Sequence, residues 1–301
     1  MALLLAEAQK LSNNTLIAGV IEEIINKEDL FAILPFTQVN SKAYVYHREN
    51  TLATADFLDP NEAINEGATS FTEVVATLKI LAGDVDIDKF LQATMSDSND
   101  QMAIQVAKKA KALAIAFKTA LGAQTTAAKT FDGLKVLTTA GQTLNSVTAN
   151  ANGTALTFSA LDALVDQVPN GPDVLIMHRN AIRAYRALLR AAGGNDGAIV
   201  QMDNFGRAML THNGIPIIAN DFLSVAETEG SSTGICTSVY AARLNEVDGL
   251  HGLYGGDAAG IVVENVGTVQ SKDATRIRLK WYCGTALKST KSLARLRGVI
   301  V

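Results

Sequence analysis

The sequence predicts an α+β fold, because its strand-like and helix-like segments do not alternate as a doubly wound parallel sheet requires. Segment 72–88, TEVVATLKILAGDVDID, alternates apolar and polar residues as a strand does. A helix-like pattern follows over 99–121. Most of the remaining strand-like runs lie in the C-terminal half, interrupted by helical segments at 157–168 and 179–194.

Composition limits the class of protein. The chain has 301 residues, of which 48% are hydrophobic, so one large domain or two can enclose a well-buried core. A net charge of −4 provides no strong attraction to nucleic acid or to an anionic membrane. Cys236 and Cys283 lack metal-ligand spacing, and we expect both to be buried thiols in a reducing compartment.

The ends of the chain and its apolar runs give no membrane signal. The start, MALLLAEAQK, makes a poor signal peptide, because Glu7 breaks its leucine run and no basic segment precedes it. No apolar run approaches the ~18 residues that a membrane span needs. We therefore expect a soluble chain that is made in the cytosol and has no membrane partner.

An arm, a helix and a long hairpin are predicted in the first ninety residues. Residues 15–26 have the pattern of an amphipathic helix, and strands are predicted over 42–48 and 72–88. Residues 72–82 alone would span about 35 Å. The side chains predicted on one face of this second strand are Val74, Ala76, Leu78 and Ile80.

A polar loop of more than 20 residues separates the two strands, at 49–71. Loops of this length are usually functional or contact another element. A two-stranded ribbon is also marginally stable alone. We therefore expect the hairpin to lie on another surface, either of its own chain or of a neighbouring chain.

The long helix is apolar on more than one side. Ser98 and Gln101 fit a capping box, and Gly122 marks the end, so the helix is about 35 Å long. Ile104 and Ile115 lie off the main stripe. The helix is either an ordinary core helix or one that a sheet covers on one side and a neighbouring chain contacts on the other. The main stripe contains Met102, Val106, Leu113, Phe117 and Leu121.

The second half of the chain is predicted to be rich in strands. Residues 123–155 favour a loop with weak strand character, and Asn213–Gly214 favours a tight hairpin turn within 208–219. The helix at 179–194 is expected to bury Ile182, Tyr185 and Leu189. Strands are predicted at 173–178, 237–244, 260–267, 272–283 and 292–300, with Ile277, Leu279, Trp281 and Cys283 facing inward.

The acidic run DVDID places Asp84, Asp86 and Asp88 on one face of a strand. It resembles the opening of a calcium loop, but an EF-hand needs Gly at the sixth position and Glu at the twelfth. Lys89 and Met95 occupy those positions. An acidic strand that faces solvent or a partner is the favoured interpretation.

Other candidate sites are equally weak. His47, His178, His212 and His251 are isolated in the sequence, so each is expected to be a hydrogen-bonded structural residue. The glycine-rich segment 249–260 lacks the Lys-Ser/Thr of a P-loop and is expected to be a turn. We predict no catalytic, cofactor-binding or metal-binding residue, and no enzyme activity.

The basic C-terminal segment carries Lys288, Lys291, Arg295 and Arg297. It has no interleaved aromatic residues of the kind that stack on nucleic acid bases, and the whole chain is acidic. A solvated strand face with ion-pair partners is favoured over a nucleic-acid contact.

The order of arm, extended hairpin, long helix, α+β middle and strand-rich return resembles the major capsid protein of tailed bacteriophages, which has the Hong Kong phage-type (Johnson) fold. The resemblance covers about residues 15–300, and specificity comes from several matches in order. The segments that carry it are YVYHRENTLATADF, LKILAGDVDIDKF, FDGL, NFGRAMLTHNGIPIIANDF, LHGLYGG and RIRLKWYCGTALKSTKSLARLRGV.

The resemblance implies a division into four parts. Residues 1–35 would be the N-terminal arm, and residues 36–88 would be the E-loop hairpin that lies over an adjacent subunit. Residues 89–150 and 265–301 would form the peripheral domain with its spine helix. Residues 151–264 would form the axial domain.

The resemblance also implies partners and contact residues. The subunits would form the pentamers and hexamers of an icosahedral virion capsid around double-stranded DNA, after assembly in the host cytoplasm. A separate scaffolding protein, a portal and decoration proteins would be further partners, and no cofactor is implied. The candidate contact residues are Lys42, Tyr44, Tyr46, Arg48, Phe57, Phe71 and Glu73 on the hairpin, with Ile104 and Phe117 on the spine helix.

Two departures and two alternatives accompany this prediction. Some relatives begin with a long scaffold-like domain, whereas here the fold starts near residue 15. Some relatives are crosslinked through a Lys–Asn bond, and Lys42 has no identifiable partner for one. An encapsulin-like compartment with the same fold is the first alternative. An α+β enzyme with a dispersed site around His47, Asp84 and Asp86 is the second.

Overall fold

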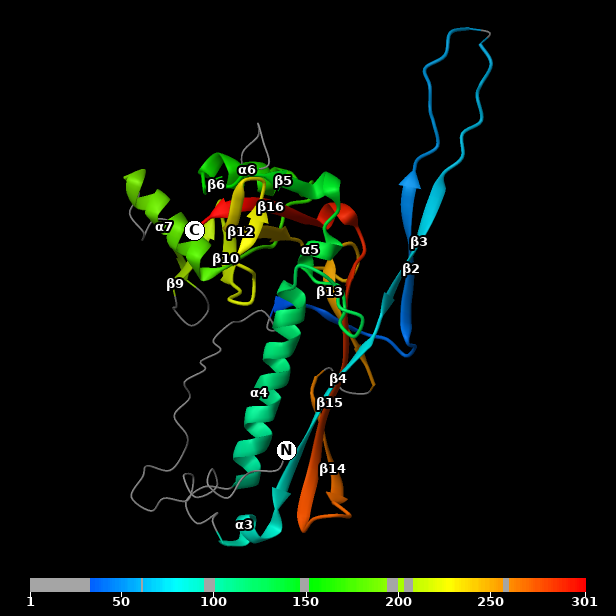
Figure 1. Cartoon of the computed structure of the whole chain (residues 1–301). Helices are drawn as coiled ribbons and strands as arrows, with labels where there is room; N and C mark the ends of the chain where they lie inside the picture. Colours follow the sequence, from blue (N-terminus) through cyan, green and yellow to red (C-terminus); the bar gives the residue numbers. More distant parts are fainter. Residues whose placement is uncertain are drawn as a thin grey trace.

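The computed structural model describes residues 33–301 except for 61, 95–100, 147–151, 194–199, 203–207 and 257–259. It confirms the α+β class. Figure 1 shows a sheet-and-helix body, an elongated body below it in which a long helix lies along a sheet, and a hairpin that projects from their side. The predicted helix at 15–26 and Ser98 of the predicted capping box lie outside the described residues.

The upper body contains a nine-stranded sheet with the path β5-β16-β12-β7-β10-β9-β8, in which β11 also pairs with β12 and β6 with β16. The predicted turn joins β9 to β10, where Asn213 and Gly214 have positive φ values of 51° and 81°. The strands are β5 (Thr143–Asn145), β6 (Thr154–Ala155), β7 (Val174–Met177), β8 (Val200–Met202), β9 (Ala208–His212), β10 (Ile215–Ala219), β11 (Glu227–Glu229), β12 (Ser232–Ala242) and β16 (Leu293–Ile300).

Two helices cover one face of this sheet. Helix α6 (Phe158–Asp166) begins after Thr157, whose hydroxyl accepts a hydrogen bond from the Ala160 amide at 3.2 Å. Helix α7 (Arg179–Ala191) buries Tyr185 and Leu189 as predicted, whereas Ile182 is only half-buried. It follows β7 in the connection that runs through β8 and β9 to β10, the parallel neighbour of β7. The core on this face contains Leu161, Leu164, Leu175, Met177, Tyr185, Val239 and Leu296.

The lower body is built on β15 (Ala274–Leu287), which pairs with three antiparallel strands. Its first part lies between β4 (Lys79–Asp88) and β14 (Val262–Thr268), and its last part pairs with β13 (Leu250–Gly255). Strand β1 (Phe36–Gln38) extends this sheet beside β13. The inward residues predicted for this strand, Ile277, Leu279, Trp281 and Cys283, are all buried.

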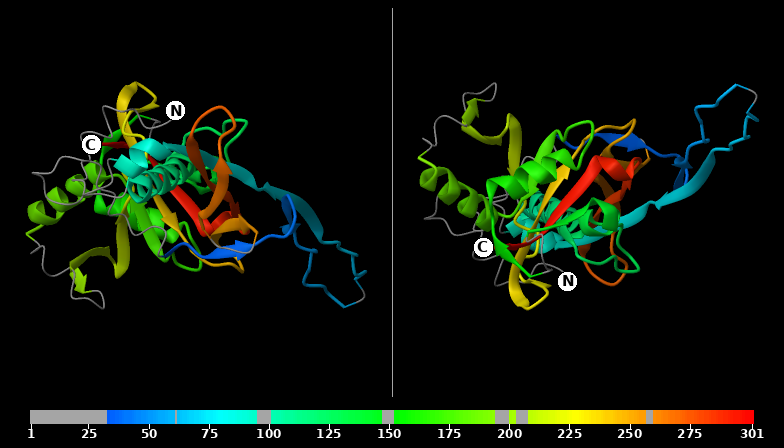
Figure 2. Two further views of the ribbon diagram at one scale, coloured as in Figure 1. Left: turned by 90° about the horizontal axis from the view of Figure 1, so that it is seen from below. Right: turned by 90° about the horizontal axis from the view of Figure 1, so that it is seen from above.

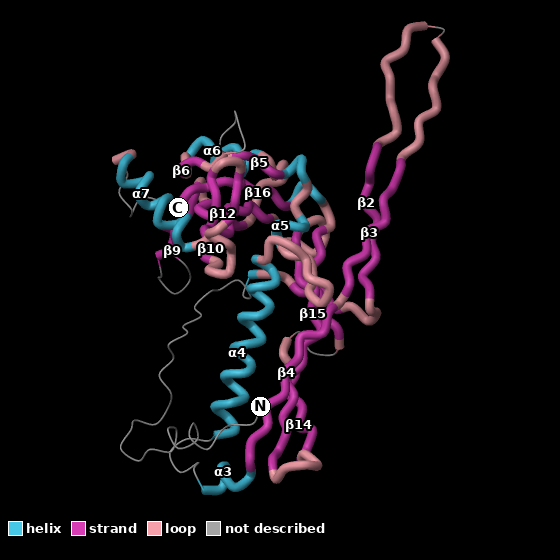
Figure 3. The backbone as a smooth tube through the Cα atoms, in the orientation of Figure 1, coloured by secondary structure: helices cyan, strands magenta, loops and turns pink. Residues whose placement is uncertain are grey.

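Helix α4 (Gln101–Gly122) lies along this sheet, as the backbone tube shows (Figure 3), with the short helices α3 (Lys89–Thr94) and α5 (Leu134–Leu137) near its two ends. Its predicted stripe is confirmed, because Leu113 packs on Ile277 and Leu279. Phe117 is fully buried and stacks on Trp281, with ring centroids 4.7 Å apart. Ile104 is half-buried and belongs to none of the core clusters of the described residues.

The predicted continuous strand 72–88 is wrong, because the chain breaks at Leu78 into β3 (Ser70–Thr77) and β4. The Leu78 amide donates to the Lys42 carbonyl at 3.0 Å, and the Leu78 side chain packs beside Leu253. A shift of one residue reverses the face of every later side chain. Ile80, predicted to face the same way as Val74, is therefore 74% exposed.

Phe117→Ala should lower the free energy of unfolding of the subunit by roughly 3–5 kcal/mol, because it empties a closed aromatic cluster. Ile104→Ala on the same helix should cost clearly less, since its side chain is half-exposed. Urea unfolding followed by Trp281 fluorescence and circular dichroism measures both. Equal losses would show that the chain's own core encloses both positions alike.

Candidate subunit-contact surface

The hairpin of β2 (Ala43–Thr51) and β3 carries large apolar side chains that no other described residue covers. The two strands pair from Ala43–Thr77 to Thr51–Ser70, and the segments 52–60 and 62–69 extend beyond them. Phe57 is 108% exposed and Ile64 is 85% exposed. Phe71, Glu73 and Lys42, which were predicted as contact residues, are also exposed. A ribbon with this surface has no core of its own.

The hairpin is also strongly acidic. Residues 49–78 contain six carboxylates and no Lys, Arg or His. None of the six forms an ion pair within the described part of the chain. They are Glu49, Asp56, Asp59, Glu62, Glu66 and Glu73.

The hairpin root is attached to its own chain by three residues that the resemblance named as candidates for contact with a neighbouring subunit. The Tyr46 hydroxyl donates to the Leu287 carbonyl at 2.7 Å, and Arg48 Nε donates to the Lys288 carbonyl at 2.7 Å. The Tyr44 ring packs edge-on against the buried His251 ring. The described contacts of these three residues therefore anchor the hairpin where β15 ends, and any contact they make with a neighbour stays a prediction.

A groove of about 730 Å³ runs along this root. Arg48, Lys288 and Lys291 supply positive charge to it, and Val247 is 77% exposed at its edge. Two of the four C-terminal cations named from the sequence thus lie beside the hairpin, on the connection between β15 and β16.

The acidic strand has its partners within the chain. Asp86 is opposite Arg276 and Asp84 is opposite Arg278 in the β4–β15 register, and both pairs are bidentate at 2.6–2.8 Å. Hydrogen bonds from these arginines hold the pKa of both carboxyl groups below the ordinary value. The expected solvent or partner contact is therefore replaced by an ion-pair ladder across two strands.

The alternative of a dispersed acidic enzyme site receives no structural support. No three His, Cys, Asp or Glu side chains among the described residues are grouped to hold a metal ion. His47 lies opposite Glu73 on the hairpin, whereas Asp84 and Asp86 are engaged by arginines on β15. Cys236 and Cys283 are buried free thiols, as predicted.

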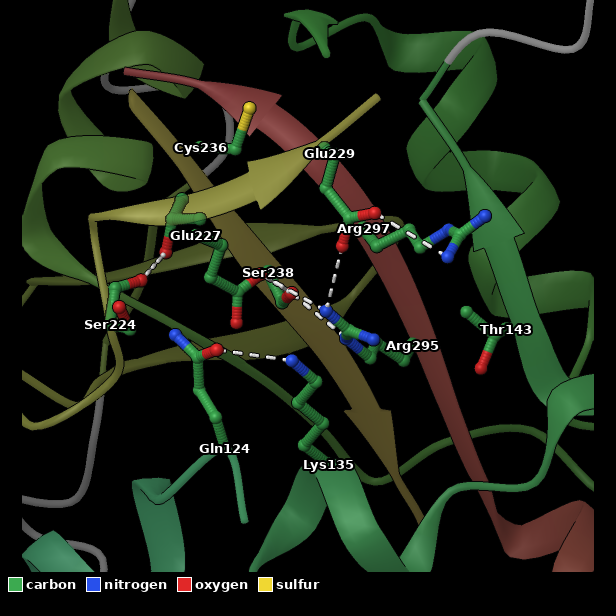
Figure 4. Close-up of polar contacts among 12 residues, drawn as sticks. Gln124, Lys135, Thr143, Ser224, Glu227, Glu229, Cys236, Ser238, Arg295 and Arg297 are labelled. Atoms are coloured by element: carbon green, nitrogen blue, oxygen red, sulfur yellow. Dashed lines mark hydrogen bonds and ion pairs between the residues drawn. The ribbon is translucent and has the colours of Figure 1, made fainter. Parts of the chain in front are cut away.

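The predicted solvated face of the C-terminal strand is wrong for Arg295, which is buried on β16 (Figure 4). Its guanidinium donates to Glu227 at 3.0 Å, Glu229 at 3.3 Å and the Ser238 hydroxyl at 2.9 Å. A buried charge is tolerated only where such partners surround it. This network holds β11 against β12 and β16, and it removes Arg295 from any surface that nucleic acid can reach.

A second polar group connects α6, α7 and β9. His212 Nε2 lies 2.9 Å from Asp162, and its Nδ1 lies 3.1 Å from the Tyr185 hydroxyl. The Phe158 ring stacks on the imidazole. Both ring nitrogens are used within the fold, so this His has the structural role expected of an isolated histidine.

A row of four arginines on α7 was missed by the sequence analysis. Arg179, Arg183, Arg186 and Arg190 recur at spacings of four, three and four residues. This spacing puts all four on one side of a helix. The spacing is itself a signal in the sequence, and these side chains lie on a different side of the helix from its buried residues. None of the helices in the described residues has both the length and the apolar content needed to cross a membrane.

The stability of the hairpin root should depend on pH through His251. Burial disfavours the imidazolium and lowers the pKa of His251. Between that lowered pKa and about 6.5, the unfolded chain binds a proton that the folded chain does not. The free energy of unfolding should therefore decrease as pH falls below about 7. Urea titrations at several pH values should show a flatter dependence for His251→Phe. The exposed His47→Phe is the control, and an unchanged slope in His251→Phe would contradict the assignment.

Comparison with known proteins gives a match at the level of structure alone. No protein-family model matches the chain, and no curated protein matches it. An encapsulin, in the holo-SrpI complex from Synechococcus elongatus PCC 7942, has a TM-score of 0.73 at 21% identity, covering 100% of this chain and 97% of that one. The capsid of cyanophage A-1(L) has a TM-score of 0.66 at 12% identity, covering 97% and 99%. The capsid of an empty GTA particle has a TM-score of 0.64 at 13% identity, covering 98% of each chain.

These matches extend over nearly the whole of both chains. At such low identity they establish the architecture and nothing finer. The chain has the Hong Kong phage-type capsid fold.

Proposed function

We propose that the chain is a shell subunit, which assembles into pentamers and hexamers of an icosahedral particle and has no enzymatic role. The observation that carries this proposal is the projecting hairpin (Figure 1), on which Phe57 and Ile64 are exposed and are covered by no other described part of the chain. Exposed apolar surface of this extent marks an interaction site in a soluble protein. The shared fold with capsid and encapsulin chains supports the same conclusion.

Assembly by such a hairpin follows from symmetry. A contact between two different surfaces of identical subunits is heterologous, and it closes a ring when the rotation per subunit permits. The hairpin supplies one such surface at the edge of the molecule. Its root is held to the body by the hydrogen bonds of Tyr46 and Arg48, and the tip projects from there.

We further propose that the particle is a phage head that encloses double-stranded DNA. Several of the structural neighbours are phage or GTA capsids, and an acidic chain binds DNA weakly, as a container requires. Separate scaffolding, portal and decoration proteins belong to this proposal. So does the division into arm, E-loop, peripheral and axial parts.

One adjustment to that division is part of the proposal. Strand β16 pairs with β12 in the sheet that also contains β7 and β10, so we place 293–300 with the axial domain. Strand β13 pairs with β15, so we place 250–255 with the peripheral domain. The inter-subunit roles of the hairpin candidates and of Ile104 are proposals of the same kind. Phe117, the other candidate on the spine helix, is fully buried in its own chain and is not proposed as a contact.

An encapsulin-like compartment is the second candidate, and the holo-SrpI match favours it specifically. Expression of the chain alone in a bacterium, followed by particle purification and electron microscopy, tests both candidates. We expect closed shells or capsomer rings. Shells that form without any scaffold and contain a protein cargo would favour the compartment. A chain that stays monomeric at high concentration, with and without a scaffold, would contradict both.

Replacing residues 52–69 with Asn-Gly should give a folded subunit that builds no stable shell. Thr51 and Ser70 are paired neighbours, so a two-residue turn can join them without strain. The melting temperature should stay within a few degrees, because the removed residues contact no core cluster.

A control loop of eighteen Gly and Ser residues keeps the length and removes Phe57 and Ile64. Particles are counted by light scattering and electron microscopy, and unfolding is followed by calorimetry. If the shortened subunit itself unfolds, the tip belongs to the folding core. If the Gly/Ser loop assembles normally, the tip side chains are not the contact.

A further inference from the structure

The arginine row on α7 forms a continuous positive face. At 100° per residue, Arg179, Arg183, Arg186 and Arg190 fall within about 60° of the helix circumference, along about 16 Å of its axis. They line a hollow of about 460 Å³ together with Ile182 and Ala219. We call this surface the arginine face.

Its charges are largely uncompensated. Arg179 pairs with Asp221 at 2.7 Å, but Arg183, Arg186 and Arg190 make no ion pair within the described part of the chain. Helix α7 contains no Asp or Glu. Like charges three and four residues apart repel one another, and cations near a helix N-terminus are disfavoured. The pattern therefore weakens the isolated helix, and an anionic partner would relieve this repulsion.

The other arginines of the described residues offer no comparable surface. Arg276, Arg278 and Lys280 are paired with carboxylates on neighbouring strands, and Arg295 is enclosed. Arg48 donates to backbone carbonyls at the hairpin root. The arginine face is thus where exposed guanidinium groups without carboxylate partners are concentrated.

The chain contains a matching anionic surface. Residues 52–69, which we call the acidic tip, carry Asp56, Asp59, Glu62 and Glu66 beside the exposed Phe57 and Ile64. Guanidinium groups bind carboxylates with bidentate geometry, as Arg276 and Arg278 do on β15. They also stack on aromatic rings such as that of Phe57.

The two surfaces lie at opposite ends of the subunit. In Figure 1 and in both views of Figure 2, the hairpin extends from one side and α7 lies at the other. They do not meet within one chain of this structure, because the hairpin projects from its hydrogen-bonded root away from the body. Complementary surfaces on opposite ends are what a head-to-tail contact between identical subunits requires.

We propose that the acidic tip of one subunit binds the arginine face of the next, with Phe57 seated against the apolar part of the hollow at Ile182. The proposal rests on the proposed function as a shell subunit and names the surface that receives the hairpin. The phosphate backbone of nucleic acid is the competing occupant of the arginine face. The observations favour the acidic tip, because the tip carries exposed apolar side chains as well as carboxylates and the hollow offers both Ile182 and arginines.

Charge exchange tests the contact. One variant carries Arg183→Glu, Arg186→Glu and Arg190→Glu, a second carries Asp56→Lys, Asp59→Lys and Glu66→Lys, and a third carries all six. The changed side chains are exposed, so each variant should keep the wild-type melting temperature. Each single-surface variant should lose at least tenfold in shell yield, and the six-fold variant should recover most of it. The control reverses the exposed Lys89, Lys129 and Lys272, with the same change in net charge as the first variant and no loss expected.

A disulfide test reports the contact directly. Glu66→Cys combined with Arg186→Cys should give covalent dimers and longer ladders on non-reducing gels after mild oxidation. Glu66→Cys combined with Lys129→Cys is the control and should give none. The native thiols Cys236 and Cys283 are buried and contribute little background.

The results of the charge exchange distinguish a failure of the proposed contact from a failure of the proposed shell function. Wild-type shells together with normal assembly of the Arg→Glu variant would overturn the contact and leave the shell function intact. Normal assembly with loss of co-purified DNA would assign the arginine face to nucleic acid instead. Loss in both single-surface variants without recovery in the six-fold variant would also overturn it. A wild-type chain that never assembles would overturn both proposals.

Discussion

The length of β15 constrains the rest of the structure. Its fourteen residues run the length of the sheet of the lower body, and none of its three partner strands pairs with all of them. Strands β4 and β14 therefore pair with its first part and β13 with its last. Its inward side chains form the surface on which α4 packs, and its final carbonyls accept the hydrogen bonds that hold the hairpin root. The core, the spine and the projecting hairpin are all positioned by this one strand.

Charged side chains in the described structure fall into two groups. Arg276, Arg278 and Arg295 have carboxylate partners across or between strands, and they stabilise pairings that the fold needs. The acidic hairpin and the arginine face have almost no ion-pair partners among the described residues. Unpaired charge on a surface costs little in water, so folding alone does not require this separation. The separation makes physical sense when the partners of these charges lie on another molecule.

Sequence patterns predicted the elements whose determinants are local. The stripe of α4, the alternation within β15 and the Asn213–Gly214 turn each follow from periodicity or turn chemistry. The break at Leu78 and the burial of Arg295 were missed, because each depends on residues far away in the sequence. Phe57, which was named only as a candidate contact residue, is exposed, whereas the intrachain hydrogen bonds of Tyr46 and Arg48 reach residues far away in the sequence and were not foreseen.

The acid content of the hairpin also bears on which contacts its exposed surface can form. An exposed two-stranded ribbon has unpaired strand edges and apolar side chains, which favour pairing with another ribbon of the same kind. With six carboxylates and no cation over residues 49–78, two hairpins repel each other at close range. The same charges are attracted to a positive surface. One feature of composition thus disfavours the wrong contact between hairpins and favours a contact with a different surface of the same protein.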